Sequence, residues 1–86
     1  MEIERGLVMI IHEKDLSDKN RSVIGVATNR ENALRMINEY YGEDAVMTEF
    51  KDIREDNFDF SCKITVSGFL GGIYEVWGED FNINMI

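Results

Sequence analysis

The chain has 86 residues, of which 44% are hydrophobic and 30% are charged, so its composition is that of one globular domain and not of a disordered chain. Seventeen acids against nine bases give a formal charge of −8, which disfavours binding to nucleic acid or to anionic lipid. The single cysteine excludes an intramolecular disulfide, and no apolar run is long enough to cross a membrane.

Two strands and a helix are predicted in the first half of the chain. Residues 7–11 form a continuous apolar run, typical of a strand buried on both faces. Residues 12–21 are polar and are expected to form a surface loop, and residues 22–27 are predicted as the second strand. At the end of the first strand His12 is the only histidine, and we interpret it as a strand-terminal polar residue.

The helix is predicted over residues 29–41. Thr28 and Glu31 have the spacing of a capping box, and Asn29 is a rival N-cap. Gly42 is well placed to end the helix in a left-handed conformation. The apolar stripe of this helix (Leu34, Ile37 and Tyr41) is expected to pack on Leu7, Met9, Ile24, Val26, Phe60, Cys62 and Ile64.

The second half of the chain predicts further strands. Residues 45–53 are predicted as a strand that ends in a charged turn, and residues 78–80 are predicted as a turn between strands at 73–77 and 81–85. From residue 58 the alternation is regular, with one face apolar (Phe58, Phe60, Cys62, Ile64, Val66) and Asp59 on the wet face. The sequence therefore predicts a single α+β domain over residues 1–86, with a mostly antiparallel sheet of about five strands (order β-β-α-β-β-β) and one amphipathic helix packed on one face.

No residue pattern predicts catalysis, a cofactor or a metal. The acids around Asp52, Asp56 and Asp59 do not have the spacing of a calcium loop. Cys62 points into the apolar layer by alternation, where a thiol behaves as a small hydrophobic group. Since a domain of this size leaves little volume for a deep cleft, a small hydrolase or metal-dependent enzyme ranks last among the functional hypotheses.

The distribution of charge suggests how the chain could bind a partner. Residues 43–86 contain ten acids and three bases, whereas residues 1–42 contain seven acids and six bases. Such an acidic surface attracts cationic partners, so we expect a basic protein partner and no direct binding to nucleic acid or membrane. The candidate partner-binding residues are Asp52, Glu55, Asp56, Asp59, Phe69, Leu70, Tyr74, Glu75, Trp77 and Glu79.

Two functional hypotheses follow from this surface. The first is a small acidic, non-catalytic protein-interaction module, which could form a homodimer through a strand edge or through the loop that carries Phe69 and Leu70. These two side chains either fold back over the sheet or form an exposed contact patch. The second hypothesis is an inhibitor whose carboxylates mimic nucleic-acid phosphates and occupy the basic groove of a host nuclease or defence protein. It requires the carboxylates to share one face.

The first 42 residues resemble a group of known proteins. An apolar strand ending in His12 and Glu13 is followed by a polar loop and by the string VIGVATNRENALRMINEYYG. This layout is similar to that of small uncharacterised ββα-type proteins of bacteriophages and Gram-positive bacteria. The resemblance implies an antiparallel α+β domain and a phage or mobile-element context, and it implies no activity. From the opening residues, which lack a basic and apolar export signal, we expect a cytoplasmic protein.

Overall fold

The computed structural model describes residues 7–69 and 71–82, and within them it has five strands and one helix. The elements are β1 (Leu7–Asp15), β2 (Arg21–Ala27), α1 (Arg30–Tyr41), β3 (Ala45–Glu55), β4 (Phe58–Val66) and β5 (Gly72–Asn82). The predicted α+β class and the element order β-β-α-β-β-β are confirmed. No helix in this part of the chain is long and apolar enough to cross a membrane.

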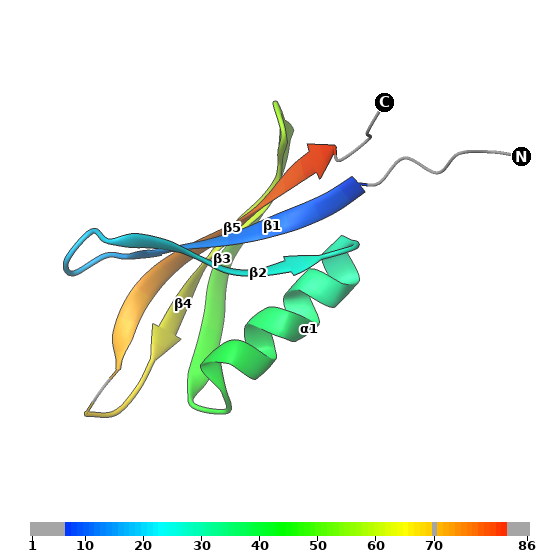
Figure 1. Ribbon diagram of the computed structural model, residues 1–86. Helices are drawn as coiled ribbons and strands as arrows, with labels where there is room; N and C mark the ends of the chain where they lie inside the picture. Colours follow the sequence, from blue (N-terminus) through cyan, green and yellow to red (C-terminus); the bar gives the residue numbers. More distant parts are fainter. Residues whose placement is uncertain (1–6, 70, 83–86) are drawn as a thin grey trace, which may run out of the picture.

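The strands form one antiparallel sheet in the order β2-β1-β5-β4-β3 (Figure 1). β5 lies between β1 and β4, so it joins the β1–β2 hairpin to the β3–β4 hairpin. The two edge strands are irregular: the pairing of β2 shifts once, and that of β3 shifts twice, with positive φ angles at Glu49 and Arg54. Such bulges twist an edge and hinder its pairing with another chain.

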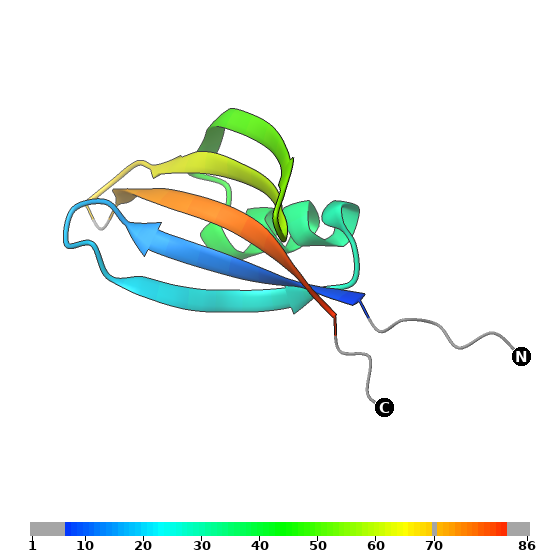
Figure 2. The same cartoon turned by 90° about the horizontal axis from the view of Figure 1, so that it is seen from above.

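The core lies between the sheet and α1, which covers one face of it (Figure 2). Its buried apolar residues come from all the elements except β3, and they are Met9, Ile11, Ala27, Ala33, Ile37, Phe60, Cys62, Ile64 and Val76. Ile24, Leu34 and Tyr41 pack against this cluster, as predicted. The prediction for Val26 is wrong, since its side chain is 53% exposed on the opposite face. The side chain of Leu7 lies outside the described part of the structure.

Asn29 is the N-cap of α1. Its side-chain oxygen accepts a hydrogen bond from the backbone N–H of Asn32 at 2.8 Å, whereas Thr28 accepts one from the Asn32 side chain. Asn29, the rival cap of the sequence prediction, is therefore the cap, and Thr28 does not have that role. Gly42 has a φ of 85° and donates its N–H to the carbonyl of Asn38, which confirms its role in ending the helix.

The strands β1 and β5 are longer than predicted. β1 continues to Asp15 because its second half pairs with residues 74–77 of β5, so the expected loop at 12–21 shrinks to the residues after Asp15. The predicted turn at residues 78–80 is wrong, since Gly78 pairs with Ile11 on one side and with Phe60 on the other. The predicted last strand, 81–85, merges into β5 as far as Asn82, and its residues 83–85 lie outside the described residues.

Candidate protein-interaction surface

The sheet face opposite α1 is covered by no other element within residues 7–69 and 71–82 (Figure 2), and we call it the open face. Because side chains alternate along each strand, the register determines which residues point to it. The apolar and aromatic ones include Val23 and Val26 from β2, Ile10 and His12 from β1, Trp77 and Phe81 from β5, Phe58 from β4 and Ile53 from β3. An uncovered surface of this kind is a candidate interaction site.

Trp77 is at the centre of the open face and is held by His12 of the neighbouring strand. The two rings are stacked, with centroids 5.2 Å apart and an angle of 9° between their planes. His12 Nε2 lies 2.9 Å from Oε1 of Glu79, which is two residues beyond Trp77 on the same strand. The hydrogen bond orients the imidazole, and the stack on the imidazole in turn restricts the orientation of the indole.

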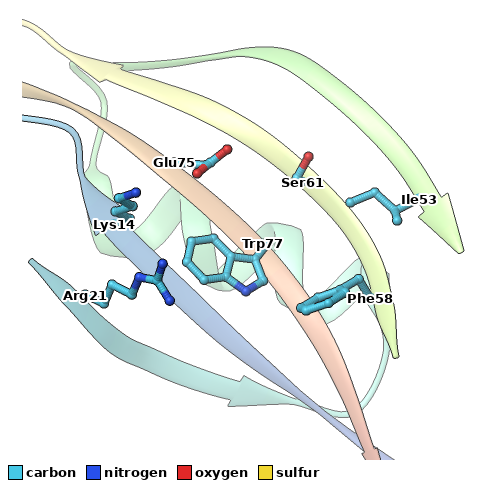
Figure 3. Close-up of a pocket in the computed structure, with 7 residues that line it drawn as sticks. All are labelled: Lys14, Arg21, Ile53, Phe58, Ser61, Glu75 and Trp77. Carbon is cyan, nitrogen blue, oxygen red and sulfur yellow. The ribbon is translucent and has the colours of Figure 1, made fainter. Parts of the chain in front are cut away.

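A shallow hollow of about 320 Å³ surrounds Trp77 (Figure 3), and we call it the Trp77 hollow. It is lined by Lys14, Arg21, Ile53, Phe58, Ser61, Glu75 and Trp77. Figure 3 shows the cations Lys14 and Arg21 on one side of the indole and the apolar Phe58 and Ile53 on the other. The hollow therefore has a charged end and an apolar end, separated by an aromatic floor.

A second, smaller hollow of about 50 Å³ adjoins the first and shares Ser61 and Glu75 with it. It adds Lys51 and Lys63 to the lining, together with Glu49. Lys63 Nζ lies 3.0 Å from Oε2 of Glu49, so this acid is paired within the hollow itself. The open face thus carries several of the bases of an otherwise acidic chain.

Phe58 reaches the open face because of a bulge in β4. In the pairing with β5, Phe58 lies opposite Glu79 and Phe60 lies opposite Gly78, so Asp59 is an extra residue between them. The extra residue reverses the alternation at this end of the strand. The predictions that Phe58 points to the core and that Asp59 points to water are therefore both wrong.

Asp59 lies on the helix side of the sheet, 9% exposed, in an ion-pair network. Its Oδ2 accepts from Arg30 Nε at 2.6 Å, and Arg30 Nη2 also donates to Asp52 Oδ1 at 2.6 Å. Arg54 Nε lies 3.0 Å from the same Asp52 oxygen. The hydrogen bonds from Arg30 and then from Arg54 lower the pKa of Asp52 below its ordinary value of 3.8. Two of the predicted partner-binding acids are thus occupied in holding the helix to the sheet.

The other predicted residues are dispersed. Glu55 and Asp56 are exposed at the β3–β4 turn, and Phe69 is 100% exposed in the β4–β5 connection, whereas Leu70 lies outside the described residues. Tyr74 is on the helix side, where its ring lies 5.4 Å from that of Tyr41, and burial raises its pKa. Only Glu75, Trp77 and Glu79 come together on the open face.

Sequence reasoning missed His12, Lys14, Arg21, Ile53 and Phe58 as members of this surface. For His12 and Lys14 a signal was present, since residues 12–15 continue the alternation of a strand when β1 is extended past Ile11. For Phe58 no local signal was present, because the bulge follows from the pairing with β5.

Cys62 is 3% exposed in the core, on the face that alternation predicted. Burial raises the pKa of its thiol from 9.0 to about 11. Because the thiolate is the reactive form, we expect an aromatic disulfide reagent at mildly alkaline pH to react at least ~100-fold more slowly with the native chain than with the chain unfolded in guanidinium chloride. Absorbance of the released thiolate measures both rates, and equal rates would contradict the buried position.

Within the part of the chain that the structure describes, no three His, Cys, Asp or Glu side chains are grouped so that they could hold a metal ion. In the comparisons with known proteins, no family model, curated protein or solved structure matches this chain. The candidate surface therefore rests on its own geometry.

Proposed function

We propose that this chain is a small, acidic, non-catalytic protein-interaction module that binds its partner on the open face. The observation that carries the proposal is the Trp77 hollow, which lies on a sheet face that α1 leaves uncovered. In line with the resemblance of its first half, we place it in the cytoplasm of a cell that carries a phage or mobile element.

The hollow has the features of an interface centre. Aromatic side chains in the middle of a contact surface contribute a large share of binding free energy, and tryptophan is the most enriched among them. The His12 stack and its hydrogen bond to Glu79 hold Trp77 in place before binding, which lowers the entropy cost of ordering it. Phe58 and Ile53 add apolar area next to it.

The distribution of the acids favours this function over the phosphate mimic. Asp52 and Asp59 lie on the helix side and pair with Arg30, whereas Glu75 and Glu79 lie on the opposite face. Glu49 is paired with Lys63. A mimic needs unpaired carboxylates on one face, so we retain it only as the alternative: an acidic inhibitor of a host nuclease or defence protein.

A displayed library of random peptides tests the proposal. We expect the immobilised wild-type chain to enrich a related set of sequences, and we expect Trp77→Ala to lower the binding of the enriched peptides at least ~tenfold, because truncation of a central tryptophan removes a dominant contact. Tyr40→Ala is a matched control, since Tyr40 is an exposed aromatic on the outer side of α1 and its loss should leave binding unchanged.

Failure to enrich any sequence, or enrichment of peptides that bind Trp77→Ala as well as they bind the wild type, would contradict the proposal. Circular dichroism of each variant shows that the fold is retained. Because Trp77 lies on the open face and outside the core, we expect its replacement to be tolerated.

A further inference from the structure

Two bases of the Trp77 hollow face each other across neighbouring strands. Lys14 on β1 lies directly opposite Arg21 on β2 in the strand register, and both line the hollow. Like charges that face each other across an antiparallel pair repel, and the acid level with Lys14 on its other side, Glu75 of β5, offsets only part of the two positive charges. Among residues 7–69 and 71–82, neither of them forms an ion pair with an acid. Two bases without an acid partner of their own, next to a half-buried tryptophan, favour an anionic ligand.

The charges of the whole lining also favour an anionic ligand. The two adjoining hollows are lined by four bases (Lys14, Arg21, Lys51 and Lys63) and two acids (Glu49 and Glu75), although the chain carries −8 overall. Glu49 is neutralised by Lys63, which leaves Glu75 against Lys14, Arg21 and Lys51. The expectation of a basic partner rested on the acids as a group, and the hollow itself favours an acidic one.

The apolar end of the hollow sets a second requirement. Lys14 is on β1 and Ile53 is on β3, with β5 and β4 between them, so three strand spacings separate the two positions. At ~4.8 Å per spacing this is ~14 Å across the strands. Lys14 is level with Glu75, whereas Asp52, the neighbour of Ile53, is level with Gly78, so Ile53 is also displaced by about three residues, or ~10 Å, along the strands. The two positions are therefore ~17 Å apart, which an extended peptide covers in about five residues. Figure 3 shows Phe58 beside Ile53 at this end. A ligand that fills the hollow needs an acid and an apolar side chain about five residues apart.

We infer that the Trp77 hollow binds an acidic, extended protein segment, whose carboxylates contact Lys14 and Arg21 and whose aromatic or large apolar side chain, about five residues away, packs on Phe58 and Ile53. This inference rests on the proposed function and names the class of partner. A nucleic acid fits less well, because Glu75 lies within the hollow and a longer polyanion meets the field of a chain with net charge −8.

A defined peptide tests the inference. The probe is acetyl-Gly-Glu-Glu-Ser-Gly-Ser-Phe-Gly-amide, and the readout is the emission of Trp77, the only tryptophan of the chain. We expect saturable quenching or a spectral shift at low ionic strength, and we expect Lys14→Glu with Arg21→Glu to weaken binding at least ~tenfold. The control pair Lys19→Glu with Arg35→Glu makes the same change in net charge outside the hollow and should weaken binding less than ~threefold.

Each other outcome decides the question. If a peptide with two lysines in place of the glutamates binds more tightly and still changes the Trp77 emission, the inference is overturned while the proposed function stands. If an eight-nucleotide oligothymidylate binds more tightly than the acidic peptide, the inference and the proposed function both fail.

Equal weakening by the two double variants would mean a general charge effect and no acid-specific site. Arg21→Glu alone repeats the test with a smaller change to the fold. A mass of two chains by light scattering, which falls when the peptide is added, would assign the hollow to a second copy of this chain and overturn the choice of partner.

Discussion

Replacement of Arg30 by methionine is expected to lower the free energy of unfolding by about 2 to 3 kcal/mol. Arg30 is the first residue of α1, and its guanidinium donates to the Asp59 carboxylate, to the backbone carbonyl of Asp59 and to Asp52. Methionine preserves the packing of the side chain but leaves the buried Asp59 carboxylate with Arg54 alone, whose Nε is 3.5 Å from Oδ1. A buried carboxylate that loses its main partner destabilises the folded state. Because the Asp59 carboxylate keeps its pair with Arg54, we expect a loss near the lower end of the values known for broken buried ion pairs.

Chemical denaturation of matched variants measures this effect. Arg35→Met makes the same substitution at an exposed position of the same helix, and it should change the stability by less than ~0.5 kcal/mol. Adding Asp59→Leu to Arg30→Met removes the orphaned charge and should recover most of the loss. If Arg30→Met were as stable as Arg35→Met, the network would have no net role in holding α1 to β4.

The pH dependence of the same two proteins gives an independent check. The pKa of Asp52 is lowered, chiefly by its hydrogen bond from Arg30 and next by that from Arg54. A group whose folded-state pKa is depressed contributes stability above its ordinary pKa of 3.8 and loses it as the pH falls through the folded value. The difference in stability between wild type and Arg30→Met should therefore shrink as the pH falls below 3.8.

The elements with strong local signals were predictable from the sequence. The helix has an apolar stripe, a capping side chain at one end and a glycine at the other, and all three act within a few residues of chain. The strand at residues 60–64 alternates cleanly, so Phe60, Cys62 and Ile64 were placed in the core correctly. Such signals depend only on neighbouring residues, which is why the sequence contains them.

The candidate site was less predictable because it depends on pairing between distant segments. Asp59 and Phe58 changed faces through a bulge that exists only when β4 pairs with β5. Arg21 and Ile53 reach the same hollow from opposite edges of the sheet, although 32 residues of sequence separate them. Charge counted along the chain suggested an acidic surface, whereas charge counted over the lining of the two hollows gives four bases and two acids.

Gly78 is a second position at which local sequence led to the wrong prediction, because tertiary packing determines the structure. Between Trp77 and two acids a glycine indicates a turn, yet here it sits in the middle of β5 because the core leaves no room for a side chain. A Cβ at this position would lie 2.6 Å from Cε1 of Phe60 and 2.7 Å from Sδ of Met9, and both of these residues are buried. The packing of Phe60 and Met9 against this position therefore explains the glycine, and the strand continues through it without a turn.

Replacement of Gly78 by alanine is expected to lower the free energy of unfolding by about 2 to 3 kcal/mol, in the upper part of the range for overpacked cores. Met9 can move the end of its side chain at small cost, but the ring of Phe60 is fully buried and stacked on Phe50 at 5.6 Å. Since the clash is with the ring, Phe60→Leu should relieve it, and the double variant should lose less stability than the sum of the two single variants. Chemical denaturation of the four proteins measures this coupling. Strict additivity would mean that the strand shifts to accept the methyl group, and that Gly78 has no packing role in joining the two hairpins.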